Sequence, residues 1–180
     1  VAALLLGYRA ALGRLRRRAE PEAGPDKPGS FRPAELERYA RHIILREIGG
    51  AGQKRLKEAR VLVVGAGGLG SPVLLYLAAS GVGTIGVVDD DVVDNSNLQR
   101  QVIHSDDRIG QPKVQSALAA VRALNPFITL VPHQMRLDDS TAALIGDYDL
   151  ILDGTDNFDT RYLINRLAVG SGTPLIAAAI

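Results

Sequence analysis

The stretch that decides the fold is RVLVVGAGGLGSPVLLYLAASGVGTIGVVDDDVVDNSNLQRQ, residues 60–101. It begins with the apolar β-branched run 61–64, passes through glycines spaced as GxGxxG, and continues with a helical pattern to Ser80. Residues 84–88 give a second strand pattern, which ends at Asp89. The order strand, glycine turn, helix, strand and acid predicts the start of a parallel α/β sheet that binds a nucleotide.

The glycine turn has the residue types that contact with a phosphate requires. Gly65 permits a tight turn, Gly67 lets the backbone approach the phosphate, and Gly70 lets the helix pack close to the strand. Free amides at the start of a helix favour an anion. We therefore expect Gly65, Gly67, Gly68 and Gly70 to bind the nucleotide, and Asp89, nineteen residues after Gly70, to bind its ribose.

The polar segment after the second strand pattern bears on which nucleotide binds. Asn97, Arg100 and Lys113 follow the ribose acid. A triphosphate concentrates negative charge that a nicotinamide cofactor lacks, and guanidinium and ammonium groups are suited to hold it. These residues favour ATP, although exposed surface positions explain Arg100 and Lys113 equally well when each is taken alone. An NAD-dependent Rossmann oxidoreductase and a non-catalytic nucleotide-binding scaffold therefore stay open as alternatives.

Asp90 and Asp91 next to Asp89 are candidates for a metal cluster. Alternation along a strand sends neighbouring side chains to opposite faces, so only one of the two can share a pocket with Asp89. We therefore expect Asp90 and Asp91 to be solvated loop residues. The three histidines of the chain show no metal-ligand spacing, and we expect them to be surface or packing residues.

The remaining patterns complete an α/β fold, a doubly wound and mostly parallel sheet of the Rossmann type. Strand patterns occur at 128–132, 150–153 and 175–179, and helical patterns at 111–124 and 157–169. Before the sheet we expect an N-terminal helical arm at 31–59. Its helix begins at Pro33, presents Ile43, Ile44 and Ile48 as an apolar face, and ends at Gly49-Gly50.

Composition agrees with one α/β core. The chain has 180 residues, 46% of them hydrophobic, and a formal net charge of +1, which gives no indication of a nucleic-acid partner. It has no cysteine, so it contains neither a disulfide nor a cysteine zinc site. The chain does not begin with methionine and stops inside a strand pattern, so we expect it to be truncated at both ends.

The amino-terminal residues differ from the rest in charge. Residues 1–18 are an apolar and basic leader with five of the 21 basic side chains, which leaves 16 against 20 acidic ones afterwards. Three alternatives stay open: the remnant of a membrane span, an interfacial helix, or a helix packed on protein. In the first two, the leader would tether the protein to the cytoplasmic face of a membrane. Residues 19–30, with three prolines and two glycines, predict a flexible linker.

Five segments together resemble a known family. They are RYARHIIL (38–45), VLVVGAGGLGSPVLLYLAASGVG (61–83), DDDVVDNSNLQRQ (89–101), HSDDRIGQPKV (104–114) and LDGTDNFDTR (152–161). They are similar, in order and spacing, to the adenylyltransferase superfamily of ubiquitin-activating enzymes. The resemblance is closest to bacterial members that adenylate the sulfur carriers of molybdopterin and thiamine synthesis. Residues 60–180 are then an incomplete ATP-binding adenylation domain.

The resemblance implies roles for individual residues. Asp89 resembles the ribose-binding acid of the family, and Asn97, Arg100 and Lys113 resemble its phosphate-binding residues. Asp156, after the strand pattern 150–153, resembles the acid that positions magnesium. Without the resemblance, a turn residue at the end of a strand is the better interpretation of Asp156.

One further residue is implied to act across a subunit interface. Arg41 resembles the arginine that the family supplies to the active site of a neighbouring subunit. The resemblance therefore implies a homodimer. The catalytic residues that it implies are Arg41, Arg100, Lys113 and Asp156.

The resemblance also implies cofactors, a partner and a location. Members use ATP and Mg²⁺ to activate the carboxylate of a ubiquitin-like sulfur carrier, which ends in Gly-Gly, as an acyl-adenylate. Their second half often binds Zn²⁺ through cysteines and supplies a reactive cysteine. Because this chain has no cysteine, that part of the chemistry belongs to sequence beyond it. We expect a cytoplasmic adenylyltransferase.

Overall fold

The computed structural model of the chain describes residues 30–178. The leader 1–18 and the linker, except for Ser30, lie outside the described residues, so the membrane tether stays a prediction. The division into leader, linker, arm and adenylation domain likewise stays a prediction. Within residues 30–178, no helix combines the length and the apolar character that crossing a membrane requires.

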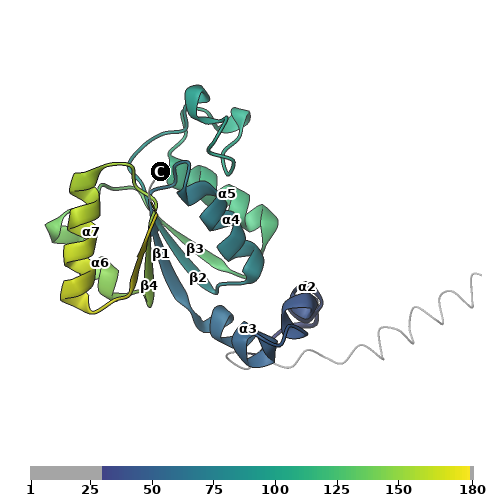
Figure 1. The fold of residues 1–180 in the computed structure, drawn as a ribbon. Helices are drawn as coiled ribbons and strands as arrows, with labels where there is room; N and C mark the ends of the chain where they lie inside the picture. Colours follow the sequence, from purple (N-terminus) through teal and green to yellow (C-terminus); the bar gives the residue numbers. More distant parts are fainter. Residues whose placement is uncertain (1–29, 179–180) are drawn as a thin grey trace, which may run out of the picture. The chain divides into compact units, whose positions relative to one another are not determined.

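Five strands form one sheet in which every neighbouring pair is parallel (Figure 1). Their order is β3-β2-β1-β4-β5, so the chain starts in the middle of the sheet and adds strands on both sides. The strands are β1 (Arg60–Val64), β2 (Thr84–Val88), β3 (Thr129–His133), β4 (Leu150–Asp153) and β5 (Leu175–Ala177). This arrangement confirms the predicted doubly wound, Rossmann-like fold.

Helices cover both faces of the sheet (Figure 1). One face carries α4 (Gly70–Ser80) and α5 (Lys113–Leu124), and the other carries α6 (Ala142–Gly146) and α7 (Phe158–Ser171). Successive side chains of a strand point to opposite faces, and both faces of β1 are apolar. The core therefore has two layers, one on each side of β1.

Each core layer combines strand and helix residues. Val61 and Val63 of β1 pack with Leu74 of α4 in the first layer. Leu62 and Val64 pack in the second layer, whose other members include Ile145, Ile151 and Ile164. All of these side chains are at most 4% exposed, so the central strand is buried on both faces, as expected for a parallel sheet.

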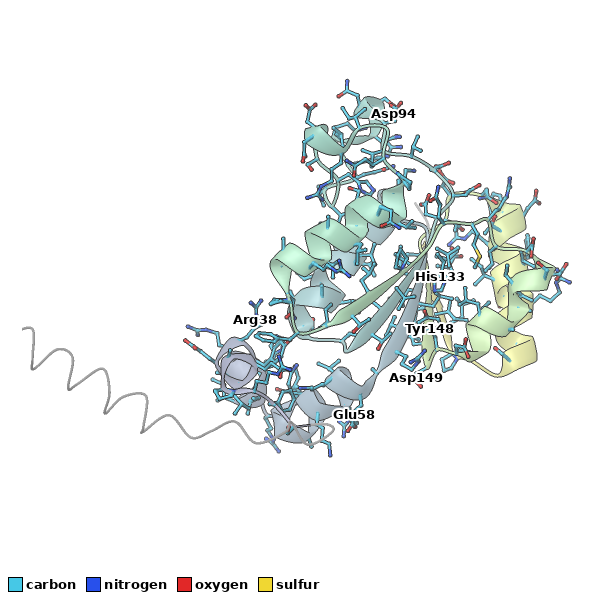
Figure 2. All side chains as sticks on the ribbon, turned by 180° about the vertical axis from the view of Figure 1, so that it is seen from behind. Arg38, Glu58, Asp94, His133, Tyr148 and Asp149 are labelled. Atoms are coloured by element: carbon cyan, nitrogen blue, oxygen red, sulfur yellow. The ribbon has the colours of Figure 1, made fainter. Side chains whose placement is uncertain are left out.

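The histidine of β3 belongs to the second side of the sheet. Tyr148 extends across that face, and its hydroxyl lies 3.1 Å from Nε2 of His133 (Figure 2). Burial lowers the pKa of His133, which keeps the imidazole neutral near pH 7. His133 is therefore a packing residue, as predicted.

Some element boundaries differ from the sequence-based expectation. The strand pattern 175–179 gives the shorter β5, and the helix expected at 111–124 begins two residues later, at Lys113. The sequence analysis missed α6 and the short 3₁₀ turns Asn95–Asn97, Asp106–Arg108 and Asp139–Thr141. These elements are too short for hydrophobic periodicity to be recognised.

The helical arm differs more from the prediction. The expected helix from Pro33 to Ile48 ends at Ile43, and a second helix, α3 (Gly49–Glu58), begins where the first was expected to stop. The predicted apolar face is only partly right: Ile43 and Ile48 are half-buried, but Ile44 is 79% exposed, and the buried aromatic residue of α2 (Pro33–Ile43) is Tyr39.

Contacts between the two helices explain the reversal of the chain after Ile43. Nδ1 of His42 lies 3.0 Å from Oε1 of Gln53, and Lys57 Nζ lies 2.8 Å from a carboxylate oxygen of Glu35. Both contacts need α3 to fold back on α2. Tertiary packing therefore overrides the local preference for one longer helix.

The glycine turn joins β1 to α4 by a very close approach of the backbone. Gly65 has a φ of 92°, a conformation that other residues rarely adopt. A Cβ atom added to Gly70 would lie 1.8 Å from the carbonyl oxygen of Gly65. The predicted role of Gly70 in close helix–strand packing is thus confirmed, and it places α4 directly after the turn.

This close approach predicts a large difference between two glycine substitutions. Gly70→Ala forces backbone atoms apart and should lower the free energy of unfolding by about 3 kcal/mol or prevent folding. Gly170→Ala is the matched control, because Gly170 is an exposed position in α7 with no atom near an added Cβ. It should be neutral or stabilising by about 0.5–1 kcal/mol. Urea unfolding measures both, and equal stabilities would contradict the packing described here.

Candidate functional site

A cavity of about 650 Å³ lies where β1, β2 and β4 end at their carboxyl sides. Ligands of open parallel sheets bind at this edge, where the strand order reverses direction. The cavity is within the size range of small-molecule sites. Of the predicted site residues, Gly65, Gly67, Gly68, Asp89, Arg100, Lys113 and Asp156 line it, while Asn97, Gly70 and Arg41 do not.

Asp89 connects the end of β2 to the glycine turn. Its Oδ2 accepts a hydrogen bond from the Ala66 amide at 2.7 Å, and its Oδ1 accepts one from the Asp91 amide at 2.9 Å. A carboxylate has further lone pairs beyond these two, so Asp89 retains acceptor capacity toward the cavity. The side chain that sequence spacing assigned to ribose is therefore held in place before any ligand binds.

Asp90 and Asp91 are exposed residues outside the strand, as expected, but the expectation that only one of them shares a pocket with Asp89 was wrong. Carboxylate oxygens of Asp89, Asp90 and Asp91 all lie within 4.8 Å of one another, and all three residues line the cavity. The strand ends at Val88, so the alternation that was assumed to separate the side chains no longer applies. In the part of the chain that the structure describes, this is the only such group of three potential metal ligands.

Lys113 is bound to one of these acids. Its Nζ lies 2.8 Å from Oδ2 of Asp91, and the lysine side chain is 6% exposed against 68% for the aspartate. Lys113 is also the first residue of α5, and its backbone amide donates to the Asp91 carbonyl oxygen at 2.9 Å. The first turn of α5 therefore places the Lys113 ammonium group at the cavity, where exposed Asp91 binds it. A bound anion can take the place of Asp91.

Arg100 lies over the glycine turn. A Cβ added to Gly68 would meet Cδ of Arg100 at 3.4 Å, so the aliphatic part of the arginine covers this glycine. Asn97 accepts a hydrogen bond from Nη2 of Arg100 at 2.8 Å through its side-chain oxygen. Asn97 does not line the cavity, and in this structure it orients Arg100.

A short 3₁₀ turn positions Asn97 and Arg100. Asp94 precedes the turn, and its Oδ1 accepts hydrogen bonds from the Ser96 hydroxyl at 2.5 Å and the Ser96 amide at 2.8 Å. These bonds lower the pKa of Asp94, the bond from the hydroxyl most. Sequence spacing alone does not reveal this capping interaction as a support for Arg100.

The loop after β4 contributes Asp156. This side chain is exposed and lines the cavity, with no hydrogen-bond or ion-pair partner among the described residues. Its neighbours have structural roles: Asn157 caps α7 by accepting from the Thr160 amide at 2.9 Å. Buried Asp153 accepts from the Thr155 amide at 2.9 Å and from Nε of Arg161 at 3.2 Å.

The sequence analysis missed four residues at this site: Gln101, Arg136, Arg161 and His104. Gln101, Arg136 and Arg161 line the cavity, and Gln101 is 3% exposed with an Oε1 that has no hydrogen-bond partner in the described chain. His104 lies behind the glycine turn. The position of Gln101 directly after Arg100 could have indicated that it lines the same cavity. Arg136 lies in a segment without a recognisable motif, so no sequence pattern indicated its place.

Arg41 lies away from the cavity. It is an exposed residue near the end of α2, which packs on α3 at the amino ends of the strands. The structure therefore brings together the nucleotide and phosphate candidates of one chain without Arg41. The action of Arg41 in a neighbouring subunit stays a prediction.

The cavity is suited to bind a ligand that has a polyanionic group with a hydroxylated group next to it. Backbone amides of the glycine turn, Arg100 and Lys113 supply donors and positive charge, and Asp89 supplies the acceptor next to them. Preorganised cations of this kind stabilise charge that develops on phosphate oxygens.

Comparison with known proteins gives consistent matches. The sequence model of the ThiF family matches residues 39–180. The probable adenylyltransferase/sulfurtransferase MoeZ of Mycobacterium tuberculosis is 60% identical over 147 residues, 81% of this chain and 38% of MoeZ. The SAMP-activating enzyme E1 of Haloferax volcanii is 52% identical over 152 residues, 84% of this chain and 56% of that enzyme.

A solved structure supports the same relationship. The crystal structure of Escherichia coli MccB with ATP matches with a TM-score of 0.66 and 30% identity, over 70% of this chain and 38% of MccB. The chain thus spans between 38% and 56% of the length of these relatives.

Proposed function

The chain belongs to the ThiF family, and from this premise we propose that it is the adenylation part of an ATP-dependent adenylyltransferase. Its substrate is the C-terminal carboxylate of a ubiquitin-like sulfur carrier. The observation that carries the proposal is the cavity wall formed by the glycine turn, Arg100 and Lys113 beside Asp89. The named functions of MoeZ and the SAMP-activating enzyme support it, as does the ATP bound in MccB.

The proposed reaction is attack of a carboxylate on the α-phosphorus of ATP. An oxygen of the carrier carboxylate forms a bond to the α-phosphorus. The bond between the α-phosphorus and the oxygen that bridges to the β-phosphorus breaks, and pyrophosphate leaves with both electrons of that bond. Negative charge moves onto the leaving pyrophosphate, where Arg100 and Lys113 stabilise it. Asp89 accepts hydrogen bonds from the ribose and fixes the position of the α-phosphorus.

Lys113 fits this role because of its pairing with Asp91. The ion pair holds the ammonium group in the cavity before ATP arrives. Asp91 is 68% exposed, so its carboxylate can be solvated by water when a phosphate takes its place, whereas Lys113 is 6% exposed and needs an anionic partner in the cavity. Phosphate oxygens can therefore displace Asp91 at low cost.

Magnesium fits the cavity through Asp156. This carboxylate lines the cavity and has no partner among the described residues, whereas Asp89 and Asp91 already accept hydrogen bonds or an ion pair. Mg²⁺ commonly binds one or two carboxylates together with substrate phosphates and water. When bound, it would neutralise phosphate charge and orient the leaving pyrophosphate.

The alternative of a nicotinamide oxidoreductase explains less of the cavity. A glycine turn and a ribose acid serve NAD equally well, but the pyrophosphate of NAD carries less negative charge for Arg100 and Lys113 to neutralise than a triphosphate does. A non-catalytic scaffold would not need Asp156 aligned with the same cavity. Zinc has no cysteine ligands in this chain, so a zinc site is a proposal for sequence beyond it.

The proposed function predicts the effect of removing Arg100. In the full-length protein, Arg100→Ala should lower carrier-dependent exchange between ATP and pyrophosphate by about 10²-fold or more, the scale for losing one charge-stabilising donor. Arg122→Ala is the matched control, because Arg122 is an exposed arginine of α5 that does not line the cavity. Exchange at the wild-type rate in Arg100→Ala would refute the assignment.

We also propose that the protein is a homodimer in which Arg41 acts in the site of the partner subunit. The distance of Arg41 from its own cavity leaves the arginine available to a second subunit. In the full-length dimer, a site then consists of Asp156 from one chain and the arginine from the other.

Subunit mixing tests this arrangement. Arg41→Ala and Asp156→Asn dimers should each be inactive in the exchange assay, and mixed dimers should recover activity because one of their two sites has both residues intact. Subunit exchange is verified with differently tagged chains. If verified mixed dimers remain inactive, Arg41 acts within its own chain or has no catalytic role.

A further inference from the structure

His104 is a buried side chain between the glycine turn and α5, and the reaction described above does not use it. Its Nε2 lies 3.0 Å from the carbonyl oxygen of Ala66, and its Nδ1 lies 2.9 Å from the hydroxyl oxygen of Ser116. The residue is 7% exposed. Because both ring nitrogens are hydrogen-bonded and the ring is buried, the position and the orientation of the imidazole are fixed.

The two partners determine where the ring carries its proton. A carbonyl oxygen can only accept, so Nε2 must carry the hydrogen and donate it to Ala66. In the neutral ring Nδ1 is then an acceptor, and the Ser116 hydroxyl donates to it. Burial lowers the pKa of His104, which favours this neutral form. One tautomer alone satisfies all of these groups.

The bond to Ala66 determines the direction of the next amide. In a trans peptide the carbonyl of Ala66 and the N–H of Gly67 point in opposite directions, and residues 30–178 contain no cis peptide bond. Because the Ala66 oxygen is held toward His104, the Gly67 N–H is directed away from the buried ring. Gly67 lines the cavity, and no acceptor in the described part of the chain takes its amide hydrogen.

The peptides on both sides of Ala66 are held by further hydrogen bonds. The Ser71 hydroxyl donates to the Ala66 oxygen at 3.3 Å, and Asp89 accepts from the Ala66 amide at 2.7 Å. Ser116 stands one helical turn after Lys113 on α5. His104 therefore connects the anion-binding turn to the helix that carries the lysine.

We propose that His104 is a positioning residue for nucleotide binding, which holds the Ala66–Gly67 peptide so that the Gly67 amide donates to a phosphate. The inference rests on the proposed function, because ATP supplies the phosphate. His104 acts through the backbone and touches no reacting atom.

Comparison of ATP with adenosine tests the inference, since adenosine has the same base and ribose without phosphate. In the full-length protein, His104→Phe should weaken ATP binding by about tenfold or more, the scale of one hydrogen bond to a charged group, and leave adenosine binding unchanged. His104→Gln should recover part of the ATP affinity, because its amide can donate to the Ala66 oxygen. Isothermal titration calorimetry measures each affinity, and circular dichroism verifies folding.

If His104→Phe does not fold, the variant Ser116→Ala tests the same inference. It removes only the hydroxyl that fixes the tautomer, and it should weaken ATP binding by about threefold without changing adenosine binding. Equal weakening of ATP and adenosine, or unchanged ATP binding in the folded variants, would overturn the inference. Absence of ATP binding by the wild-type protein would instead contradict the proposed function on which the inference depends.

Discussion

The hydrogen bond from the Ala66 amide to Asp89 is the interaction on which the site depends. It joins the turn after β1 to the residue after β2, two segments that are 23 positions apart in the chain. The bond from the Gly65 amide to the Val88 carbonyl oxygen, 2.8 Å long, joins the same two segments through the backbone. The bond to Asp89 adds a side chain to this link, so that the position of Asp89 and the direction of the turn amides are fixed together before a nucleotide binds.

The rest of the site adds charge to this fixed frame. Arg100 lies over Gly68 and is oriented by Asn97, and Lys113 is held by an exposed acid. Both cations are therefore placed by neighbours rather than left as mobile surface groups. Preorganised charge of this kind favours a reaction in which phosphate oxygens gain negative charge, because little reorganisation is needed when the reaction occurs.

The sequence predicted those parts of the molecule that depend on short-range spacing. The strand, glycine turn, helix and acid of residues 60–89 have a fixed order, and the sheet follows from it. Predictions failed where distant contacts decide the structure: the break between α2 and α3 depends on pairs such as His42 with Gln53. The role of His104 was also out of reach, since its partners Ala66 and Ser116 are 38 and 12 positions away.

Activation of a carrier carboxylate by this protein can be observed directly as formation of an acyl-adenylate. The full-length protein is incubated with ATP, Mg²⁺ and a ubiquitin-like carrier that ends in Gly-Gly, and the carrier is measured by intact-mass spectrometry. We expect a mass increase of one adenylyl group on this carrier and none on a control carrier with an amidated C-terminus. No adduct on the free carboxylate, or an equal adduct on the amidated carrier, would contradict carboxylate activation by this protein.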